Sequence, residues 1–235
     1  IDGVNATYIL QEGLSGLGAD VDTDIPDRIK DGYGLNKMLI DRALDDRIDT
    51  IIPCDNGIAA AEEIAHGKKN GLTIIVTDHH EVPESLPKAI EFVDAKRKDN
   101  KYPFNQLAGC GVAFKLVQAL SRRLNIPDNE WLKYIDIACI GTISDIVTLL
   151  DENRVIAKLG LKLLQVTRNI GLKTLIEMTG LKKIDSSFIS FGISPRINAC
   201  GRMGHQEDAL NLFLTDDPIE ARKLAAKLEE YNRER

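Results

Sequence analysis

The sequence lacks the features that mark several specialised classes of protein. It has no run approaching the ~18 uninterrupted apolar residues of a membrane span, and no CxxC pair that would suggest a zinc or redox motif. Lys and Arg total 30 against 36 Asp and Glu, so the net charge of −6 excludes a protein that is basic overall, although a local basic groove remains possible. The four cysteines, Cys54, Cys110, Cys139 and Cys200, are widely spaced, and we expect reduced thiols in a cytoplasmic protein.

The beginning of the chain, Ile1, has neither an initiator methionine nor a signal-peptide pattern. We therefore expect a part of a longer protein. The 235 residues would form one large domain or two modest ones. Neither an internal repeat nor a Gly/Ser linker divides them, which favours one compact unit.

The predicted secondary structure changes in character along the chain. In the first half the pattern indicates strands at 19–25, 48–53, 72–76 and 89–93, and helices at 4–17, 36–46 and 57–69. After Gly109 it indicates helices at 111–124, 129–143, 152–167, 172–179, 205–214 and 218–235. We therefore predict an α/β fold in which a parallel β-sheet is flanked by helices and is followed by a largely helical second half.

Acidic residues follow the predicted strands. Asp55 comes directly after one apolar run, and Asp78-His79-His80 comes directly after another. Asp2 precedes the first predicted helix, a position that would follow an earlier strand. Because ligands usually bind at the C-terminal ends of parallel strands, we expect these acidic loops to converge. The alternative for Asp2 and for Asp55 is the N-cap of a helix.

The chemistry of these residues favours a metal ion. A carboxylate and two imidazoles at the tip of a buried strand have little structural purpose, and the donors of Asp78-His79-His80 suit Mn²⁺ or Mg²⁺. The alternative is a solvated turn. Asp145 interrupts an apolar segment, where a lone carboxylate would be costly to bury unless it is paired or coordinating. The alternative for Asp145 is a helix cap.

An ordered set of motifs makes the chain resemble the DHH phosphoesterase superfamily, which is named for the triplet Asp78-His79-His80. The triplet alone is a weak signal, but the set covers essentially the whole chain. The other motifs are Ile1-Asp2-Gly3, Pro26-Asp27-Arg28, Gly32-Tyr33-Gly34-Leu35, Asp55-Asn56-Gly57, Tyr102-Pro103-Phe104, 109–115, 141–145, Glu152-Asn153-Arg154, 194–199 and 201–204. Within the superfamily, the chain looks most like the bacterial exonucleases that are specific for single-stranded DNA.

The resemblance implies both site residues and a domain organisation. The positions that match residues binding or surrounding a pair of divalent ions are Asp2, Asp55, His79, His80 and Asp145, and Asp78 belongs to the same site. The resemblance also implies that residues 1–215 form a catalytic domain whose acidic first motif ends in Ile1-Asp2-Gly3. Residues 216–235 would then begin a long helix that connects to a C-terminal accessory domain.

These residues could support hydrolysis of a phosphodiester by a water molecule that two metal ions activate. Asp55 is the candidate bridging ligand, because a carboxylate has two oxygens to share. His79 is expected to bind a metal ion directly. His80 is expected either to support the metal ligands through hydrogen bonds or to donate a proton. Asp78 and His80 are the candidate catalytic residues. No Ser or Cys is paired with a base at motif spacing, so we expect no covalent intermediate.

Substrate binding is expected from residues nearer the C-terminus. Arg196 and Arg202 flank Asn198 in a turn-rich segment, and guanidinium groups suit phosphate oxygens. The alternative is a pair of structural arginines that bind loop carbonyls. His205 either joins the phosphate-binding set or caps the following helix.

The leading functional hypothesis is a metal-dependent exonuclease that acts on single-stranded DNA in repair and recombination, in the 5′-to-3′ direction by resemblance. One alternative is a phosphodiesterase or phosphatase of the same superfamily that acts on nanoRNA, nucleoside bisphosphates or cyclic dinucleotides. The long helical half favours the exonuclease over such small-substrate enzymes. Another alternative is a catalytically silent scaffold of the same fold. The residues that argue against it, all intact, are Asp55, Asp78, His79, His80 and Asp145.

Overall fold

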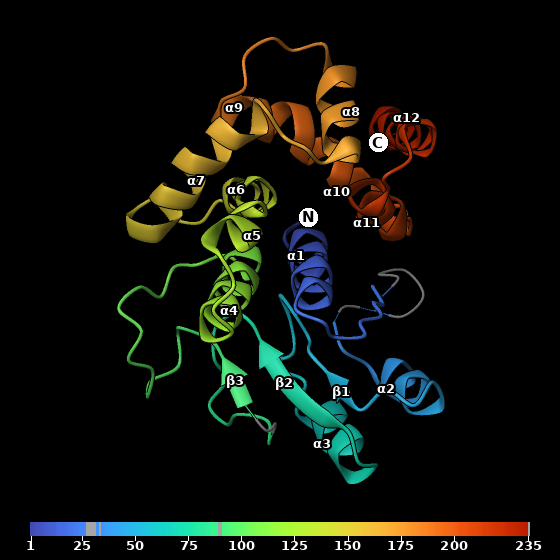
Figure 1. Cartoon of the computed structure of the whole chain (residues 1–235). Coiled ribbons are helices and arrows are strands. Elements are labelled where there is room, and N and C mark those ends of the chain that lie inside the picture. Colours follow the sequence, from blue (N-terminus) through green and yellow to red (C-terminus); the bar gives the residue numbers. More distant parts are fainter. Residues whose placement is uncertain (27–31, 33, 89–90, 235) are drawn as a thin grey trace.

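The computed structural model describes residues 1–26, 32, 34–88 and 91–234, so Asp27, Arg28 and Tyr33 of the motifs above lie outside the described residues. In chain order the elements are α1 (Asp2–Gly16), α2 (Lys37–Asp45), β1 (Thr50–Ile51), α3 (Ala61–Lys69), β2 (Thr73–Thr77), β3 (Glu91–Val93), α4 (Gly109–Arg123), α5 (Asp128–Leu132), α6 (Ile135–Ser144), α7 (Asp151–Leu164), α8 (Ile170–Thr179), α9 (Ser186–Phe188), the π-helix η1 (Ile189–Ile193), α10 (Ser194–Arg202), α11 (Gln206–Leu214) and α12 (Pro218–Glu234). Figure 1 shows a small sheet on one side of the molecule and most of the helices on the other.

The strands in the described part of the chain form one three-stranded parallel sheet in the order β1-β2-β3. Thr50 pairs with Thr73, and Ile75 pairs with Glu91. Parallel neighbours need a crossover connection, which α3 supplies between β1 and β2. A small hydrophobic cluster joins this sheet to α2 and α3, and its buried members are Ile40, Ile64, Leu72, Ile74 and Val76.

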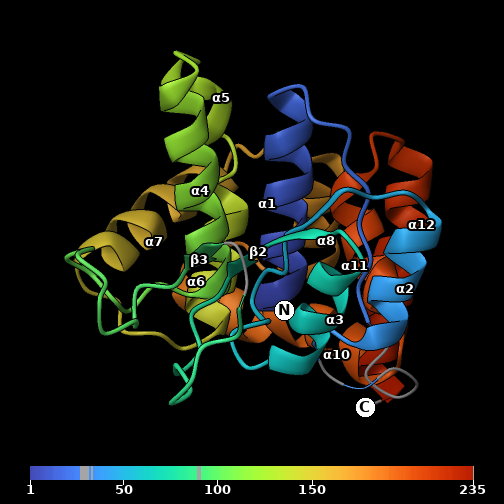
Figure 2. The same ribbon diagram turned by 90° about the horizontal axis from the view of Figure 1, so that it is seen from below.

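A much larger hydrophobic cluster holds the helices together. Helices α1 and α4 lie side by side in both views, and α6 packs against each of them (Figures 1 and 2). Nearly every residue of α6 is buried, as its largely apolar sequence predicts for a central helix. Helix α12 joins the same cluster through Ala221, Leu224, Ala225 and Leu228.

Side-chain caps explain where two of the helices begin. The side chain of Asn36 accepts a hydrogen bond of 2.9 Å from the backbone N–H of Leu39 at the start of α2. The side chain of Asn169 accepts one of 2.8 Å from Leu172 at the start of α8. Asparagine is among the best N-cap residues because its oxygen satisfies an otherwise unpaired helical N–H. Helix α8 ends at Gly180, whose φ of 67° suits the left-handed C-cap position.

The predicted strand at 19–25 is wrong, because these described residues form neither helix nor strand. The polar–apolar alternation is real, but the segment runs along helices instead of pairing with another strand. Thr23 donates to Gln11 of α1, and the side chain of Gln206 of α11 donates to the carbonyl of Ile25. The alternation therefore indicates that one side of this segment is half-buried. It does not indicate that the segment pairs with another strand.

Several predicted helix boundaries are also wrong. The single helix predicted at 129–143 is two helices, α5 and α6, separated at Lys133 and Tyr134. The segment 196–202, predicted as turn-rich, is the helix α10. Helix α3 begins at Ala61 instead of Gly57, whose φ of 106° belongs to a tight turn that favours glycine.

No disulfide joins the four cysteines, all of which the structure describes. Cys54, Cys110, Cys139 and Cys200 are all described, and all are free; Cys54 is half-buried and the others are buried. In the described part of the chain, no helix combines the length and the apolar character needed to cross a membrane.

Candidate metal centre

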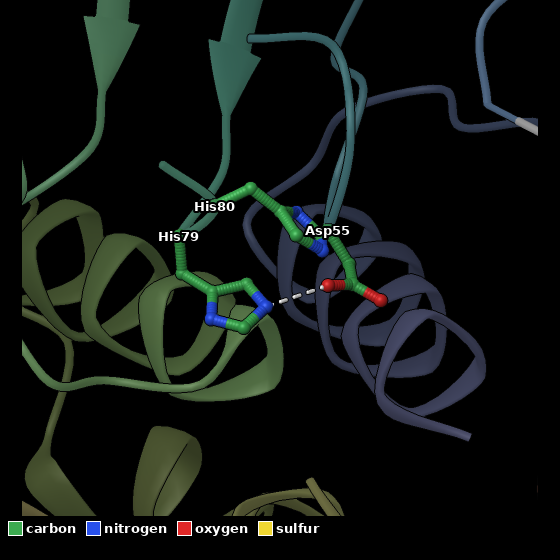
Figure 3. Close-up of side chains that lie close together, drawn as sticks. All are labelled: Asp55, His79 and His80. Atoms are coloured by element: carbon green, nitrogen blue, oxygen red, sulfur yellow. Dashed lines mark hydrogen bonds and ion pairs between the residues drawn. The ribbon is translucent and has the colours of Figure 1, made fainter. Parts of the chain in front are cut away.

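Side chains from two strand ends meet at the C-terminal edge of the sheet (Figure 3). Asp55 follows β1, and His79 and His80 follow β2. Parallel pairing continues past β1 through a bridge between Cys54 and Thr77, which aligns the two loops. As a result, Nε2 of His79 lies 2.9 Å from Oδ1 of Asp55.

The turn that carries Asp55 is not a helix N-cap. Its φ of 58° lies in the left-handed region, which aspartate tolerates better than most residues, and Gly57 follows with a φ of 106°. A side chain at Gly57 would meet Pro53 and Val76, so the turn is packed tightly onto the sheet. Since α3 begins only at Ala61, the N-cap alternative for Asp55 is wrong.

Two further carboxylates reach the same place from the helices. Oδ2 of Asp2, at the start of α1, lies 3.6 Å from Nε2 of His79. Oδ2 of Asp145, directly after α6, lies 3.8 Å from the same nitrogen. The chain leaves this position through Ile146, whose φ of 60° is rare for a β-branched residue, and such strain is often found at functional sites. The predicted convergence of the acidic loops is therefore observed.

Asp2 is held in place by a helix far away in sequence. Its carboxylate accepts hydrogen bonds from the backbone N–H groups of Gly109, at 2.6 Å, and Cys110, at 3.0 Å, in the first turn of α4. The N–H groups in the first turn of a helix have no partner within the helix, and they favour a negative charge nearby. Asp2 therefore caps α4, and the alternative that it caps its own helix is wrong. Neither backbone donor belonged to the predicted site.

Two glycines allow the helices to approach the carboxylates. A Cβ atom on Gly109 would lie 2.7 Å from Cβ of Asp55 and 3.0 Å from Oδ2 of Asp2. A Cβ atom on Gly141 would lie 2.8 Å from Oδ1 of Asp2 and would collide with Sγ of Cys110. Both glycines stand in motifs quoted for the resemblance, so their position in the sequence was a usable signal, although their role was not apparent.

Asp78 is buried and holds the two histidines of the site through hydrogen bonds. It is 1% exposed, and Oδ2 accepts a hydrogen bond of 2.9 Å from the backbone N–H of Ile58. Oδ1 accepts from the backbone N–H groups of His79 and His80 and lies 2.7 Å from Nδ1 of His80. These hydrogen bonds keep the pKa of Asp78 below its usual value despite burial. A carboxylate that binds one imidazole nitrogen orients the other for a metal ion or a substrate.

The cluster carries strongly shifted pKa values. Burial raises the pKa of Asp55, opposed by the hydrogen bond from His79. Burial and the charge of Asp2 raise the pKa of Asp145 to about 6. Burial alone would lower the pKa of His79, but its hydrogen bond to Asp55 and the charges of Asp2, Asp55 and Asp145 raise it to about 9. Positive charge is therefore strongly favoured at the centre of these carboxylates.

The arrangement fits a pair of divalent cations. In the described part of the chain, two groups of three side chains have ligand atoms within 4.8 Å of one another: Asp55, His79 and His80, and Asp2, His79 and Asp145. The groups share His79. Carboxylate oxygens with imidazole nitrogens are donors that Mn²⁺ accepts readily, and a cation there would offset the charge that now raises the pKa of His79.

A buried amide borders the centre and was not predicted. Asn5 is fully buried, and within the described residues neither polar atom of its side chain has a hydrogen-bond partner. The space beside Gly141 brings it close to Asp2, since a Cβ atom there would lie 3.0 Å from Nδ2 of Asn5 and 2.8 Å from Oδ1 of Asp2. Buried amides normally bind a partner, so Asn5 supplies unused hydrogen-bonding capacity next to the carboxylates.

The thiol nearest the centre is not poised for nucleophilic attack. Sγ of Cys54 lies 3.5 Å from Oγ1 of Thr7, and burial raises the pKa of this thiol to about 12. A thiol that stays protonated is a poor nucleophile. This agrees with the expectation that the site forms no covalent intermediate.

A pocket of about 150 Å³ adjoins Asp55 and contains part of the predicted substrate-binding set. Asn198 and Arg202, from α10, line it together with Gly3, Asn56 and Gln206. Helix α10 therefore brings a guanidinium group and an amide beside the carboxylate cluster. Guanidinium and amide groups are suited to donate hydrogen bonds to phosphate oxygens.

Arg196 and His205 lie outside this pocket. Nε of Arg196 binds Glu229 of α12 at 2.6 Å, and its Nη1 donates to the carbonyl of Gly192. These are the contacts of the structural alternative for Arg196. The ring of His205 stacks on Tyr231 of α12 with the centroids 4.8 Å apart, and its side chain makes no capping hydrogen bond to α11, whose start is described.

Comparison with known proteins identifies relatives of the chain. The model of the DHH family, N-terminal domain, matches residues 1–142. The single-stranded-DNA-specific exonuclease RecJ of Bacillus subtilis (strain 168) is 42% identical over 236 residues, which cover 100% of this chain and 29% of that protein. The chain therefore spans less than one third of the length of this curated relative.

Solved structures match as well. A crystal structure of exonuclease RecJ bound to manganese has a TM-score of 0.91 and 38% identity, and the match covers 99% of this chain and 59% of that one. RecJ from Thermus thermophilus in complex with Mn²⁺ has a TM-score of 0.86 and 36% identity, covering 99% of this chain and 33% of that one. Its complex with Mg²⁺ has a TM-score of 0.73, 34% identity and coverages of 99% and 30%. The predicted fold and family resemblance are thereby confirmed.

Proposed function

Since the chain belongs to the DHH family, we propose that it supplies the metal-dependent active site of an exonuclease that hydrolyses single-stranded DNA. The observation that carries the proposal is the convergence of three carboxylates on Nε2 of His79, which lies 2.9 Å from Asp55, 3.6 Å from Asp2 and 3.8 Å from Asp145. Relatives named as single-stranded-DNA-specific exonucleases, and related structures that hold Mn²⁺ or Mg²⁺, support the substrate and the cofactor.

The residues that would hold the metal ions are Asp2, Asp55, His79, His80 and Asp145. When bound, two divalent ions would activate the attacking water and offset the charge of the phosphate. Asp55 lies closest to His79 and has two oxygens to share between the ions. Asp78 keeps His80 oriented through Nδ1, which leaves Nε2 of His80 to bind an ion or to move a proton.

Helix α10 would position the substrate. Arg202 and Asn198 line the pocket beside Asp55, where they can donate hydrogen bonds to the oxygens of a phosphate adjacent to the scissile bond. Because the protein carries a net charge of −6, a DNA strand would be held by such local contacts, and its binding should weaken as salt concentration rises. We expect cleavage in the 5′-to-3′ direction, in the cytoplasm, and in the service of DNA repair and recombination.

The domain organisation is part of the proposal. Residues 1–215 would form the catalytic domain, and 216–235 would begin the helix that connects to an accessory domain. Within the chain, α12 packs on the catalytic domain instead of leaving it, through Ala221, Leu224 and the Arg196–Glu229 ion pair.

Metal binding and strand hydrolysis together test the proposal. Titration calorimetry with Mn²⁺ should show binding to the purified chain, and labelled single-stranded oligonucleotides should be shortened in the presence of Mn²⁺ while duplexes persist. Asp55→Asn should reduce hydrolysis by more than ~100-fold, because losing a direct ligand should exceed the 10–100-fold loss typical of an outer-shell partner. Asp49→Asn is the matched control, since Asp49 is exposed and precedes β1, at the opposite end of the same strand.

A series of oligonucleotide lengths separates the alternatives. A small-substrate phosphodiesterase would ignore all but the shortest oligonucleotides, whereas an exonuclease would degrade long strands. Binding of DNA without hydrolysis, in a preparation that binds Mn²⁺, would instead indicate the catalytically silent scaffold. Equal turnover by Asp55→Asn and the unchanged protein would remove the metal centre from the mechanism.

A further inference from the structure

One large aromatic side chain on the helix that carries Asn198 and Arg202 is almost entirely exposed. Phe191 is 78% exposed, although phenylalanine is among the residues most often buried in folded proteins. It lies in the π-helix η1, which continues directly into α10. Single π-helical turns are rare and occur frequently at functional sites.

The π-helical turn has a local cause in the sequence. Residues 186–202 form one continuous helix through α9, η1 and α10, and Pro195 stands inside it. A proline within a helix lacks the N–H group and clashes with the carbonyl four residues earlier, which is the carbonyl of Phe191. The widened turn accommodates this clash, so the backbone conformation at Phe191 is built into the chain.

Phe191 lies on the same face of this helix as Asn198 and Arg202, two of the residues of α10 that line the pocket. The successive steps from Phe191 to Pro195, from Pro195 to Asn198 and from Asn198 to Arg202 are four, three and four residues. These spacings place the four side chains in one row. The opposite face carries the core residues, whose members are Ile189, Ile193, Ile197 and Cys200. Asn198 and Arg202 line the pocket beside Asp55, so the row leads from that pocket toward Phe191.

A second contact brings this helix next to the metal centre. Oγ of Ser194, one helical turn from Phe191, is hydrogen-bonded to Oγ of Ser144. Ser144 directly precedes Asp145, whose carboxylate faces His79. Phe191 therefore lies within a few residues of a contact to the metal-binding loop.

The loop before α9 contains two lysines and begins beside this helix. A Cβ atom on Gly192 would lie 3.3 Å from Cδ1 of Leu181, so Leu181, which directly precedes Lys182 and Lys183, lies beside the residue that follows Phe191. Both lysines are exposed, and Lys183 pairs with Asp185 at 2.8 Å. An aromatic face next to basic side chains is the usual composition of a surface that binds single-stranded nucleic acid.

We propose that Phe191 is a stacking platform for one base of a single strand whose phosphate is held by Asn198 and Arg202. This inference rests on the proposed function and deepens it, because it assigns to a named residue the recognition of an unpaired base. A duplex base has both of its faces covered by its neighbours, so a stacking platform contributes to the preference for single strands. It requires no particular base, since every base has a π-face.

The first test compares three variants in binding to a fluorescent single-stranded oligonucleotide, measured by anisotropy in EDTA so that no strand is hydrolysed. Phe191→Ala should weaken binding roughly 5- to 150-fold, the range of one lost base stack. Phe191→Trp should bind as well as the unchanged protein, whereas Phe191→Leu should resemble Phe191→Ala. Ile219→Ala is the matched control, because Ile219 is also 78% exposed but lies at the start of α12, away from the pocket, and it should change nothing.

The second test locates the stacked base. A set of oligonucleotides, each with a single abasic position, should reveal one position at which the missing base weakens binding to the unchanged protein. The same abasic position should cost nothing in Phe191→Ala, because the partner of the base is already absent. In the presence of Mn²⁺, Phe191→Ala should raise KM more than it lowers kcat, because the ring holds the strand and does not touch the reacting atoms.

Each other result overturns the inference in a distinguishable way. If the unchanged protein binds and hydrolyses single strands but Phe191→Ala is equal to it, Phe191 does not stack on DNA and the proposed function stands. If Phe191→Leu binds like the unchanged protein, the ring serves as an apolar packing surface for another protein segment. If the unchanged protein binds no single strand of any length, the proposed function fails and the inference fails with it.

Discussion

The sheet region, made of β1–β3 with α2 and α3, has a far smaller hydrophobic core than the helical region, made of α1 and α4–α12. The buried core of the sheet region is a single small cluster around Ile74, whereas the cluster around Ile140 extends through most of the helices. The metal centre lies between the two. Asp55, Asp78, His79 and His80 stand on the sheet region, and Asp2 and Asp145 stand on the helical region, so the centre can be complete only when the two regions are docked.

The largest expected effect is a difference between core truncations in the two regions. Ile140 and Ile74 are both fully buried. Ile140→Ala should lower the free energy of unfolding by roughly 2–5 kcal/mol, the range for truncating a buried isoleucine, and hydrogen exchange should accelerate along the whole chain. Ile74→Ala should accelerate exchange mainly in 50–77, because its cluster is small. Identical exchange patterns in the two variants would show that both regions unfold as one unit.

Metal binding should stabilise the folded chain, because the ligands come from both regions. At a free Mn²⁺ concentration of about 100 times Kd, the free energy of unfolding should rise by about 2.7 kcal/mol, because the ion binds only the folded chain. Thermal unfolding with Mn²⁺ and with EDTA measures this shift. Asp145→Asn, on the helical side, should reduce the shift as Asp55→Asn does on the sheet side. A shift that survives both substitutions would place the bound ion elsewhere.

Adding a side chain at the contact between the two regions should lower the free energy of unfolding by somewhat less than the core truncation. Gly109→Ala places a Cβ atom 2.7 Å from Cβ of Asp55, and such overpacking costs roughly 1–3 kcal/mol. It should also weaken Mn²⁺ binding, because Asp55 and Asp2 must both move. In Gly16→Ala the new atom would meet the described chain only at the hydroxyl of Tyr134, 3.9 Å away, so this control should leave stability and metal affinity unchanged. Normal Mn²⁺ affinity in Gly109→Ala would mean that the contact between the two regions can adjust to the extra atom without displacing Asp55 or Asp2.

The ion pair between α10 and α12 should contribute about 1 kcal/mol. Arg196 and Glu229 have side chains that are only 13% and 19% exposed, so their pair is screened less than a surface pair. A double-mutant cycle of Arg196→Ala and Glu229→Ala, followed by urea unfolding, measures the coupling. The exposed pair of Lys223 with Glu220 is the control and should give almost none. If Arg196→Ala weakens DNA binding as strongly as Arg202→Ala without loss of stability, the phosphate-binding role of Arg196 is supported instead.

The smallest expected effect concerns a buried carboxylate in the helical region. Burial raises the pKa of Asp136, which accepts a hydrogen bond of 2.7 Å from Thr167. The folded state therefore holds this proton more tightly than the unfolded state, and stability is lost as pH rises from the ordinary value of 3.8 through the raised pKa. Asp136→Asn should remove that loss while keeping an acceptor for Thr167. Urea unfolding between pH 4 and pH 8 should show the variant gaining on the unchanged protein as pH rises, and a constant difference would contradict the raised pKa.

Much of the fold and of the metal centre could be predicted from residues that are neighbours in the sequence. A buried strand followed at once by Asp78, His79 and His80 needs no long-range information, because the strand end itself sets where these side chains lie. The apolar spacing that predicted α1, α2 and α4 likewise involves only residues close together in the sequence. The wrong strand at 19–25 shows the limit of such patterns, since pairing requires a neighbouring strand and this segment lies against α1 and α11 instead.

The remaining features depend on contacts between distant parts of the chain. Asp2 is bound by backbone groups 107 and 108 residues away, and Gly109 and Gly141 matter only because helices carrying them press against Asp2 and Asp55. Arg196 and Arg202 are chemically identical and six residues apart, yet Arg202 lines the pocket while Arg196 binds α12. Residue type and local spacing specify which groups are available for chemistry. Which of them meet is specified by how the helices pack on the sheet, because packing joins surfaces that have no proximity along the chain.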